Sequence, residues 1–367
     1  MEIPLLNLKR QYKAIKKEID QSLSAVLKSQ QFIRGPQVTQ LEKEVANYLG
    51  VEFAIGVASG TDALLLSLEA LQLKPGDEVI TTAFTFVATA EVILRTGATP
   101  VFVDIDPQTF NINPQKIKPA LTKRTKGILL VHLFGLPATL QPILEIAESY
   151  GLWVIEDCAQ AFGAEYKNYQ VGKFGIAGAF SFFPSKNLGG FGDGGLVSTS
   201  NPKVAETVRM LSEHGGKDKY NVTLLGHNSR LDTIQAAVLL AKLKYVNQWI
   251  KNRRRLAATY QEQLKGIGDL ILPEEPPGHY HTYNQFTIRT KQRDQLQRFL
   301  TENRIGTAIY YPCPLHHQKV FQNISRICGS LVETERAAGE VLSLPIDPLL
   351  TPEEQDYVIQ KIKEFYQ

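Results

Sequence analysis

From Val51 onward, short runs of apolar and β-branched residues alternate with longer segments that repeat apolar residues at helical spacing. Such runs, bounded by turn residues, are typical of buried strands, and their alternation with helices predicts an α/β fold with a mainly parallel sheet covered on both faces. We expect the strands at 53–58, 79–82, 99–103, 127–131 and 152–156. We expect the helices between them at 62–73, 87–96, 114–121 and 140–150.

The remainder of the chain predicts a mixed sheet edge and a second, smaller domain. Two strand candidates, 179–183 and 195–199, follow without room for long crossover helices, so the sheet is expected to be mixed at that end. Long helical patterns then occupy 231–246 and 247–264, and a smaller α+β unit is expected from strands at 283–289 and 307–311 and helices at 292–303, 332–342 and 352–365. We predict a large domain over residues 1–248, with an N-terminal helical segment, and a small domain over 249–367, with the boundary near Trp249.

Composition and charge point to a globular protein with a small-molecule partner. The chain has 367 residues, 43% of them hydrophobic, which is enough to bury a core without disulfides or metals. The net charge of +3 is small, and the surface is expected to carry charges of both signs. A nucleic-acid-binding protein would normally show a basic stripe or tail instead. The three consecutive arginines Arg253, Arg254 and Arg255 are interpreted as a solvated helix face rather than a phosphate site.

The cysteines and the apolar segments predict a cytoplasmic protein without a membrane span. Cys158, Cys313 and Cys328 are too widely spaced for a disulfide framework or a paired-thiol metal site, which favours a reducing compartment. The N-terminus lacks the apolar core of a signal peptide, and the longest apolar stretch, 127–140, is shorter than the roughly 18 residues of a spanning helix. His227 has no companion ligands at metal-site spacing, so no metal is expected.

Candidate chemistry follows the expected strands, because ligands bind at the carboxyl ends of strands in open α/β sheets. After the first strand, the turn Ser59-Gly60-Thr61 opens a helix and offers backbone N–H groups to an anion, although for this turn taken alone an ordinary N-cap by Thr61 or Asp62 is the favoured interpretation. After the second, Phe84 or Phe86 provides a ring that could stack on a planar cofactor or belong to the core.

Two adjacent acids end the fifth strand. Side chains alternate along a strand, so only one of Glu156 and Asp157 can face a site beyond it. A buried acid needs a cationic partner such as a protonated heterocyclic nitrogen, while the alternative is a helix N-cap by Asp157.

The most informative residue is Lys186, which leaves a strand into a loop with five glycines. A lysine amine can form a Schiff base with an aldehyde such as that of pyridoxal phosphate if its pKa is lowered. A lone loop lysine is usually solvated, and it is the combination with an acid, an anion-binding turn and a ring that favours the cofactor. Before the next helix, Asn228 and Arg230 could donate to phosphate or carboxylate, or the segment could simply be capped by Ser229 or Asp232.

Taken together and in their order along the chain, these segments resemble those of a known protein family. The chain resembles the pyridoxal-phosphate-dependent sugar-nucleotide aminotransferases of the DegT/DnrJ/StrS type over nearly its whole length. The matching strings are SGTDALLLSLEAL, TTAFTFVATAE, PVFVDIDPQTFNI, VHLFGLPA, IEDCAQAFGA, FSFFPSKNLGGFGDGG, GHNSRLDTIQAAVL and YYPCPLH. The resemblance implies the aspartate-aminotransferase-like fold (fold type I), and a homodimer that builds each active site from both subunits.

The resemblance also implies residue roles. Lys186 would form the Schiff base with pyridoxal phosphate, and Asp157 would bond its ring nitrogen. Phe86 and Gln160 would lie against the ring. The phosphate contacts would be Gly60, Thr61 and Ser181, with Asn228 from the partner subunit. The substrate contacts would be Arg230, Tyr310, Tyr311 and His316.

The implied reaction is transfer of the amino group of L-glutamate to a nucleotide-linked keto sugar, for surface polysaccharide or glycoside biosynthesis. KNLG followed by GDGG resembles the enzymes that aminate C3, acting on UDP-linked 2-acetamido-3-keto-glucuronate or dTDP-linked 3-keto-6-deoxyhexoses. An enzyme acting at C4 is the alternative. The chain departs from the uronate enzymes at Tyr310, where they commonly have histidine, and from many relatives at Ile176, where they have aspartate.

Three other functions compete with this one. A dehydratase of the same family has histidine in place of the Schiff-base lysine, so Lys186 argues against it. A non-catalytic cofactor-binding regulatory module is a lesser alternative, since no helix-turn-helix segment precedes the fold. A nucleotide-binding oxidoreductase needs the GxGxxG fingerprint, which is absent.

Overall fold

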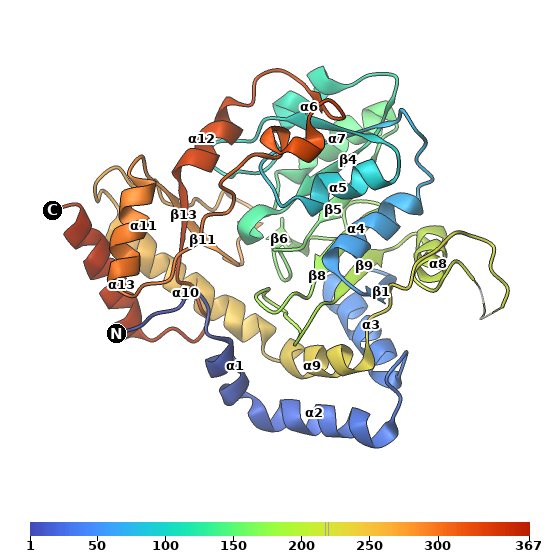
Figure 1. The fold of residues 1–367 in the computed structure, drawn as a ribbon, viewed down its shortest axis with the longest axis horizontal. Helices are drawn as coiled ribbons and strands as arrows, with labels where there is room; N and C mark the ends of the chain where they lie inside the picture. The colour runs from blue at the N-terminus through green and yellow to red at the C-terminus, as the bar shows by residue number, and fades with distance from the viewer. Residues whose placement is uncertain (217, 219) are drawn as a thin grey trace.

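The computed structural model describes residues 1–216, 218 and 220–367, and is built around one large mixed sheet (Figure 1). Its strand order is β1(Phe53–Val57), β9(Gly195–Thr199), β8(Ala177–Ser181), β5(Trp153–Asp157), β4(Thr125–Val131), β2(Glu78–Thr82), β3(Thr99–Val103) and β12(Arg326–Ile327). Strand β9 runs antiparallel to β1 and β8, and the pairs from β8 to β12 are parallel. The prediction of a sheet that is mixed at this end is confirmed.

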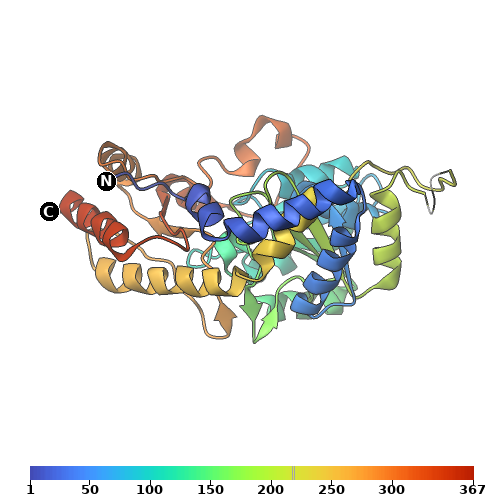
Figure 2. The same ribbon diagram turned by 90° about the horizontal axis from the view of Figure 1, so that it is seen from below.

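Helices cover both faces of the sheet, because alternate strand residues are apolar on each side. One face is packed by α4(Gly60–Glu69), α5(Ala88–Arg95) and α8(Pro202–Leu211). The other is packed by α3(Pro36–Leu49), α9(Thr233–Leu243), α6(Pro114–Ala120) and α7(Leu140–Tyr150). The N-terminal α1(Leu8–Ala14) and α2(Lys16–Ser29) precede them, and α2 packs on α9 (Figure 2).

The C-terminal part forms a second hydrophobic core. It contains β11(Phe286–Arg289) paired antiparallel with β13(Val341–Leu344), with α11(Arg293–Glu302), α12(Val332–Glu340) and α13(Pro352–Phe365). The long helix α10(Val246–Leu264) joins the two cores: Trp249 packs with Ile15 and Ile19, whereas Leu256 and Tyr260 belong to the C-terminal core. The domain boundary near Trp249 therefore falls within a continuous helix, and the division stays a prediction.

Short elements complete the fold. Strands β6(Glu165–Tyr166), β7(Tyr169–Gln170) and β10(His279–Tyr280) form a small sheet, and single helical turns occur at η1(Leu133–Gly135), η2(Leu315–His317) and η3(Lys319–Phe321). At the N-terminus, Ile3 bridges to Ile305 and is buried in the C-terminal core. In the part of the chain that the structure describes, no helix has the length and apolar character needed to cross a bilayer.

Three sequence-based expectations about this region are wrong. The segment 307–311 is not a strand, since it contributes only an isolated bridge between Ala308 and Ser343. The helix expected to run to residue 342 ends at Glu340, because the apolar residues after it pair with β11. Arg253 is not solvated: it is 3% exposed and donates to the carbonyls of Tyr283, Asn284 and Ile346.

Candidate active site

A cavity of about 430 Å³ lies where the strands β2, β5 and β8 end. Nine of the twelve residues predicted for the site line it, although they come from distant parts of the chain. They are Gly60, Thr61, Phe86, Asp157, Gln160, Ser181, Lys186, Tyr310 and Tyr311. The sheet therefore brings the predicted acid, amine, ring and anion-binding turn to one place, as the strand-end argument requires.

Asp157, rather than Glu156, faces this cavity. Its carboxylate accepts hydrogen bonds from Oγ1 of Thr89 at 2.8 Å and from the backbone N–H of Ala159 at 3.1 Å. Burial raises the pKa of Asp157, and these hydrogen bonds together with the charge of Lys186 oppose that rise. A buried carboxylate of this kind is suited to a cationic ring nitrogen.

Lys186 lies beyond the end of β8, and its amine is kept reactive by its surroundings. Burial lowers the pKa of Lys186 to about 8, partly offset by the negative charge of Asp157. The unprotonated amine, which is the form that attacks an aldehyde, is then far more populated near neutral pH than in an exposed lysine. Among the described residues, none hydrogen-bonds to its Nζ atom, so the amine is available to a ligand in the cavity.

The first turn of α4 forms a cradle for an anion. The helix is capped by Ser59, whose side chain accepts from the N–H of Asp62, so neither Thr61 nor Asp62 is the N-cap. The backbone N–H groups at a helix start are unpaired within the helix and attract negative charge. A Cβ on Gly60 would lie 2.6 Å from Cβ of Ser181, so only glycine allows these two residues to line the cavity together. This turn fits a phosphate.

Aromatic rings bound the cavity on another side. Phe86 is 55% exposed in this single chain, which is unusual for a phenylalanine and leaves its ring free to stack on a flat ligand. Tyr311 lies 6.2 Å from it between ring centroids and accepts a hydrogen bond from Nε2 of Gln160 at 3.0 Å. Burial raises the pKa of Tyr311, so the phenol stays protonated. Together with Asp157 and Lys186, these residues fit pyridoxal phosphate.

Three predicted residues do not line the cavity of this chain. Asn228 is exposed, and Arg230 is half-buried with no hydrogen-bond partner for its Nε. His316 lies in η2 and contacts Glu335 at 3.3 Å. The roles of all three stay predictions.

The sequence analysis missed several residues that the fold brings to the site. Thr89 and Thr85 are buried in contact with each other beside Asp157, and Ser185, Asp193 and Gln285 line the cavity. Thr89 lies in α5, whereas Thr85 lies in the loop before it, so helical spacing gave no signal for this pair. Nothing in the sequence marks Gln285.

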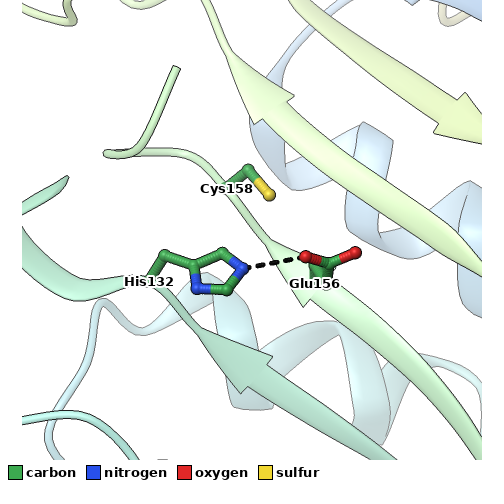
Figure 3. A group of neighbouring side chains, drawn as sticks. All are labelled: His132, Glu156 and Cys158. Atoms are coloured by element: carbon green, nitrogen blue, oxygen red, sulfur yellow. Dashed lines mark hydrogen bonds and ion pairs between the residues drawn. The ribbon is translucent and has the colours of Figure 1, made fainter. Parts of the chain in front are cut away.

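Glu156 faces the opposite side of β5 and forms a buried group with His132 and Cys158 (Figure 3). Nδ1 of His132 accepts from the N–H of Ala138, so its proton lies on Nε2, which donates to Glu156 at 3.0 Å. The same carboxylate accepts from the N–H groups of Gly172, Phe174 and Gly175. These hydrogen bonds already use both Glu156 oxygens. The group therefore has a structural role: it fixes the loop at 172–175 to the end of β5. That no metal takes part stays a prediction.

Comparison with known proteins decides the family. The model of the DegT/DnrJ/EryC1/StrS aminotransferase family matches residues 13–363. The chain belongs to this family. The family assignment confirms the predicted resemblance, the transferase class and the pyridoxal-phosphate cofactor of these enzymes.

Individual members of the DegT/DnrJ/EryC1/StrS family are similar to the chain over its whole length. It is 49% identical over 368 residues to the "Pleiotropic regulatory protein" of Geobacillus stearothermophilus, covering 100% of this chain and 99% of that one. It is 46% identical over 352 residues to a UDP-N-acetyl-3-dehydro-α-D-glucosamine 3-aminotransferase of Acidithiobacillus ferrooxidans, covering 96% and 95%. The crystal structure of S. venezuelae DesV in complex with a ketimine intermediate matches with a TM-score of 0.97 at 40% identity, covering 100% and 99%, and supports the predicted fold type I.

Proposed function

We propose that this protein transfers the amino group of L-glutamate to C3 of a nucleoside-diphosphate-linked 3-keto sugar. The observation that carries the proposal is the joint position of Lys186, Asp157 and the first turn of α4 around one cavity. When bound there, pyridoxal phosphate supplies an electron sink for the carbanion that forms when a Cα proton leaves. The phosphate would be held by Gly60, Thr61 and Ser181, which line the cavity.

The residues of the chain supply charge, orientation and proton transfer. The Asp157 carboxylate, fixed by Thr89 and Ala159, holds a proton on the ring nitrogen through its negative charge. Lys186 Nζ accepts the proton that leaves Cα of the amino donor and returns a proton later in the cycle, which its pKa of about 8 permits near neutral pH. Phe86 would stack on the ring, and Tyr311, which lies beside Phe86 and is bonded to Gln160, would limit its movement.

The chain's own sequence and its relatives support a 3-keto substrate. KNLG and GDGG around Lys186 resemble the C3 enzymes, and the Acidithiobacillus ferrooxidans relative is named for a 3-keto sugar linked to UDP. Tyr310 and Tyr311 line the cavity, which supports their proposed contact with the sugar. We do not favour C4 as the site of amination.

We further propose that a second copy of the chain completes each site. Among the described residues that line the cavity, Lys186 is the sole cation, yet L-glutamate carries two carboxylates and the sugar nucleotide two phosphates. Asn228 and Arg230 lie outside this cavity on a segment with exposed apolar residues, including Leu225, which is 95% exposed. A homodimer would bury such residues and bring Asn228 and Arg230 of the partner subunit to the site.

The compartment we propose is the cytoplasm. Cys158, Cys313 and Cys328 are all unpaired, as expected for a reducing environment. Nucleotide-linked sugars as substrates agree with this placement.

A half-reaction panel tests the proposed substrate. Protein charged with pyridoxamine phosphate is mixed with 3-keto and 4-keto sugars, as UDP and dTDP conjugates, with and without a C6 carboxylate. The return of the cofactor to its aldehyde form is followed by absorbance, with Lys186→Ala as the control. Return with a 3-keto sugar supports the proposal and names the nucleotide. Return with a 4-keto sugar alone would overturn the C3 assignment, and no return with any sugar would favour a non-catalytic cofactor-binding protein.

A further inference from the structure

The glycines that follow Lys186 make room for a side chain of α9. Glycine allows a backbone to approach another group closely. A Cβ on Gly190 would lie 2.8 Å from Oε1 of Gln235, and a Cβ on Gly192 would lie 2.9 Å from its Nε2. Two glycines of the loop between β8 and β9 are therefore explained by contact with Gln235 rather than with a ligand in the cavity.

Two side chains of α9 bind the backbone of this loop. Oε1 of Gln235 accepts from the N–H of Phe191 at 2.7 Å, and Nζ of Lys242 donates to the carbonyl of Gly189 at 2.6 Å. Residues seven apart lie on the same face of a helix, and this face of α9 meets the loop that descends from β8 (Figure 1). The helix thus holds one acceptor and one donor of the loop, two residues apart.

Lys242 is a charged residue at a buried position of α9, where an apolar side chain would be usual. Its side chain is 1% exposed, and burial lowers the pKa of its amine to about 8. Its Nζ also lies 5.1 Å from the centroid of the Phe191 ring. An apolar side chain of similar length would avoid the cost of burying an ammonium group, so the bond to Gly189 is the distinctive property of a lysine here.

The loop transmits this restraint to Lys186. The N–H of Gly190 donates to the carbonyl of Phe182 at 2.7 Å, and the N–H of Phe182 donates to the carbonyl of Gly194 at 2.8 Å. The segment 183–189 is consequently a short excursion closed at its base, and Lys186 lies at its middle, with its own N–H bonded to the carbonyl of Phe183. The position of Gly189 and Gly190 at the closed end of this segment therefore determines the position of Lys186.

We propose that Gln235 and Lys242 are positioning residues that hold Gly189 and Phe191 in place and thereby fix the amine of Lys186 in the cavity. Neither lines the cavity, so they act through the loop. The inference rests on the proposed function only for the role of Lys186. Misplacing a reacting group by about 1 Å is enough to cost on the order of a hundredfold in rate.

The test compares Gln235→Leu and Lys242→Met with a matched control on the same helix. Val238 lies between Gln235 and Lys242 on the helix and packs in one cluster with Ile15 and Ile19, so Val238→Ala removes buried volume without removing either hydrogen bond to the loop. In the full-length apoprotein we expect both loop variants to raise hydrogen exchange across residues 182–194 and to slow the capture of added pyridoxal phosphate by about tenfold or more. Val238→Ala is expected to lower the melting temperature without either effect. Gln235→Glu keeps an oxygen acceptor for the N–H of Phe191, and this variant is expected to capture pyridoxal phosphate at the rate of the unmodified protein.

Each other outcome has a definite meaning. Unchanged exchange and capture in Gln235→Leu and Lys242→Met would overturn the positioning role, while the proposed function would stand if Lys186→Ala still abolishes transamination. Equal slowing of capture by Val238→Ala would show a general effect of destabilising α9, and would also overturn it. Transamination by Lys186→Ala would instead refute the proposed function.

Discussion

Glu156 and Asp157 are neighbours on β5, and their carboxylates serve opposite sides of the sheet. Asp157 faces the cavity and is restrained by two hydrogen bonds, whereas Glu156 is fully buried and accepts four, from His132 and three backbone N–H groups. The pleat of the strand enforces this division, since adjacent side chains point to opposite faces. One acid is placed for chemistry and the other for anchoring the loop at 172–175.

Substitution of the two acids is expected to separate these roles. Asp157→Asn removes the charge beside the ring nitrogen and leaves the phosphate cradle intact, so we expect retained cofactor and a loss of turnover of at least about a hundredfold. Glu156→Gln places an amide against donors and is expected to cost about 3 kcal/mol of unfolding free energy, with turnover per folded molecule retained. Steady-state kinetics and urea denaturation of both variants check this. The reverse pattern would place Glu156 at the ring.

Lys186→Ala is expected to leave a folded protein that no longer captures pyridoxal phosphate covalently. Transamination should fall by at least about a thousandfold, because no other amine lines the cavity among the described residues. Borohydride reduction of the loaded protein followed by mass spectrometry measures the covalent link, with Lys203→Ala, a change at an exposed lysine, as the control. Retained turnover in the Lys186 variant contradicts the assignment.

The capture of pyridoxal phosphate by the apoprotein should depend on pH through Lys186. Burial lowers the pKa of this amine to about 8 from 10.5, so the reactive neutral form grows as pH rises and is complete above that value. We expect the capture rate to rise with pH, with a midpoint near 8, and then level off. The negative charge of Asp157 raises this pKa, so Asp157→Asn should move the midpoint to lower pH. Stopped-flow absorbance between pH 6 and about 10 measures both. A midpoint near 10.5 in the unmodified protein would refute the environment described for Lys186.

Thr89 is expected to matter through Asp157. Its hydroxyl donates its one proton to Asp157, so Thr85 must donate to Thr89. Thr89→Val removes a charge-assisted hydrogen bond worth about 2 kcal/mol, and we expect turnover to fall by about tenfold to thirtyfold. Thr85→Val removes a bond one step further away and should have a smaller effect. Equal turnover in Thr89→Val and the unmodified protein would show that Ala159 alone orients the carboxylate.

The sequence predicted much of the large domain because its elements are bounded by clear signals. Strands 99–103 and 195–199 and helices 140–150 and 352–365 occur at the residues expected. Gly151 marks the end of helix 140–150, Pro352 the start of helix 352–365, and Gly195 the start of strand 195–199. The strand expected at 307–311 is absent because the apolar residues of this segment are used in packing: Ile309 packs against the C-terminal core, and Tyr310 and Tyr311 pack against the cluster that contains Phe84 and Phe134.

Some residues of the site could likewise be predicted from the sequence, and others could not. Residues at the end of a strand or a few positions beyond it, such as Asp157 and Lys186, were predictable, since the sheet edge brings strand ends together. Thr89 and Gln235 were not, because their partners lie 68 and 44 residues away and are chosen by how helices pack on the sheet. The prediction that Arg253 is solvated was wrong for the same reason. The carbonyls that bind its guanidinium, those of Tyr283, Asn284 and Ile346, come from distant parts of the chain.

Gly60→Ala is expected to weaken cofactor binding specifically. The new Cβ would lie 2.6 Å from Cβ of Ser181, so the first turn of α4 must move away from β8, and the phosphate contacts of Thr61 and Ser181 can no longer be made together. We expect the dissociation constant for pyridoxal phosphate, measured by fluorescence titration, to rise by at least about tenfold, the loss of roughly one charged hydrogen bond.

Gly339→Ala is the matched control for the Gly60 variant. This glycine is exposed, lies in α12 and has no atom within 4 Å of the point that an added Cβ would occupy. Alanine there should raise helix stability by about 0.5–1 kcal/mol and leave cofactor affinity unchanged. Unchanged affinity in Gly60→Ala would mean that the phosphate binds elsewhere, and would remove the α4 cradle from the site.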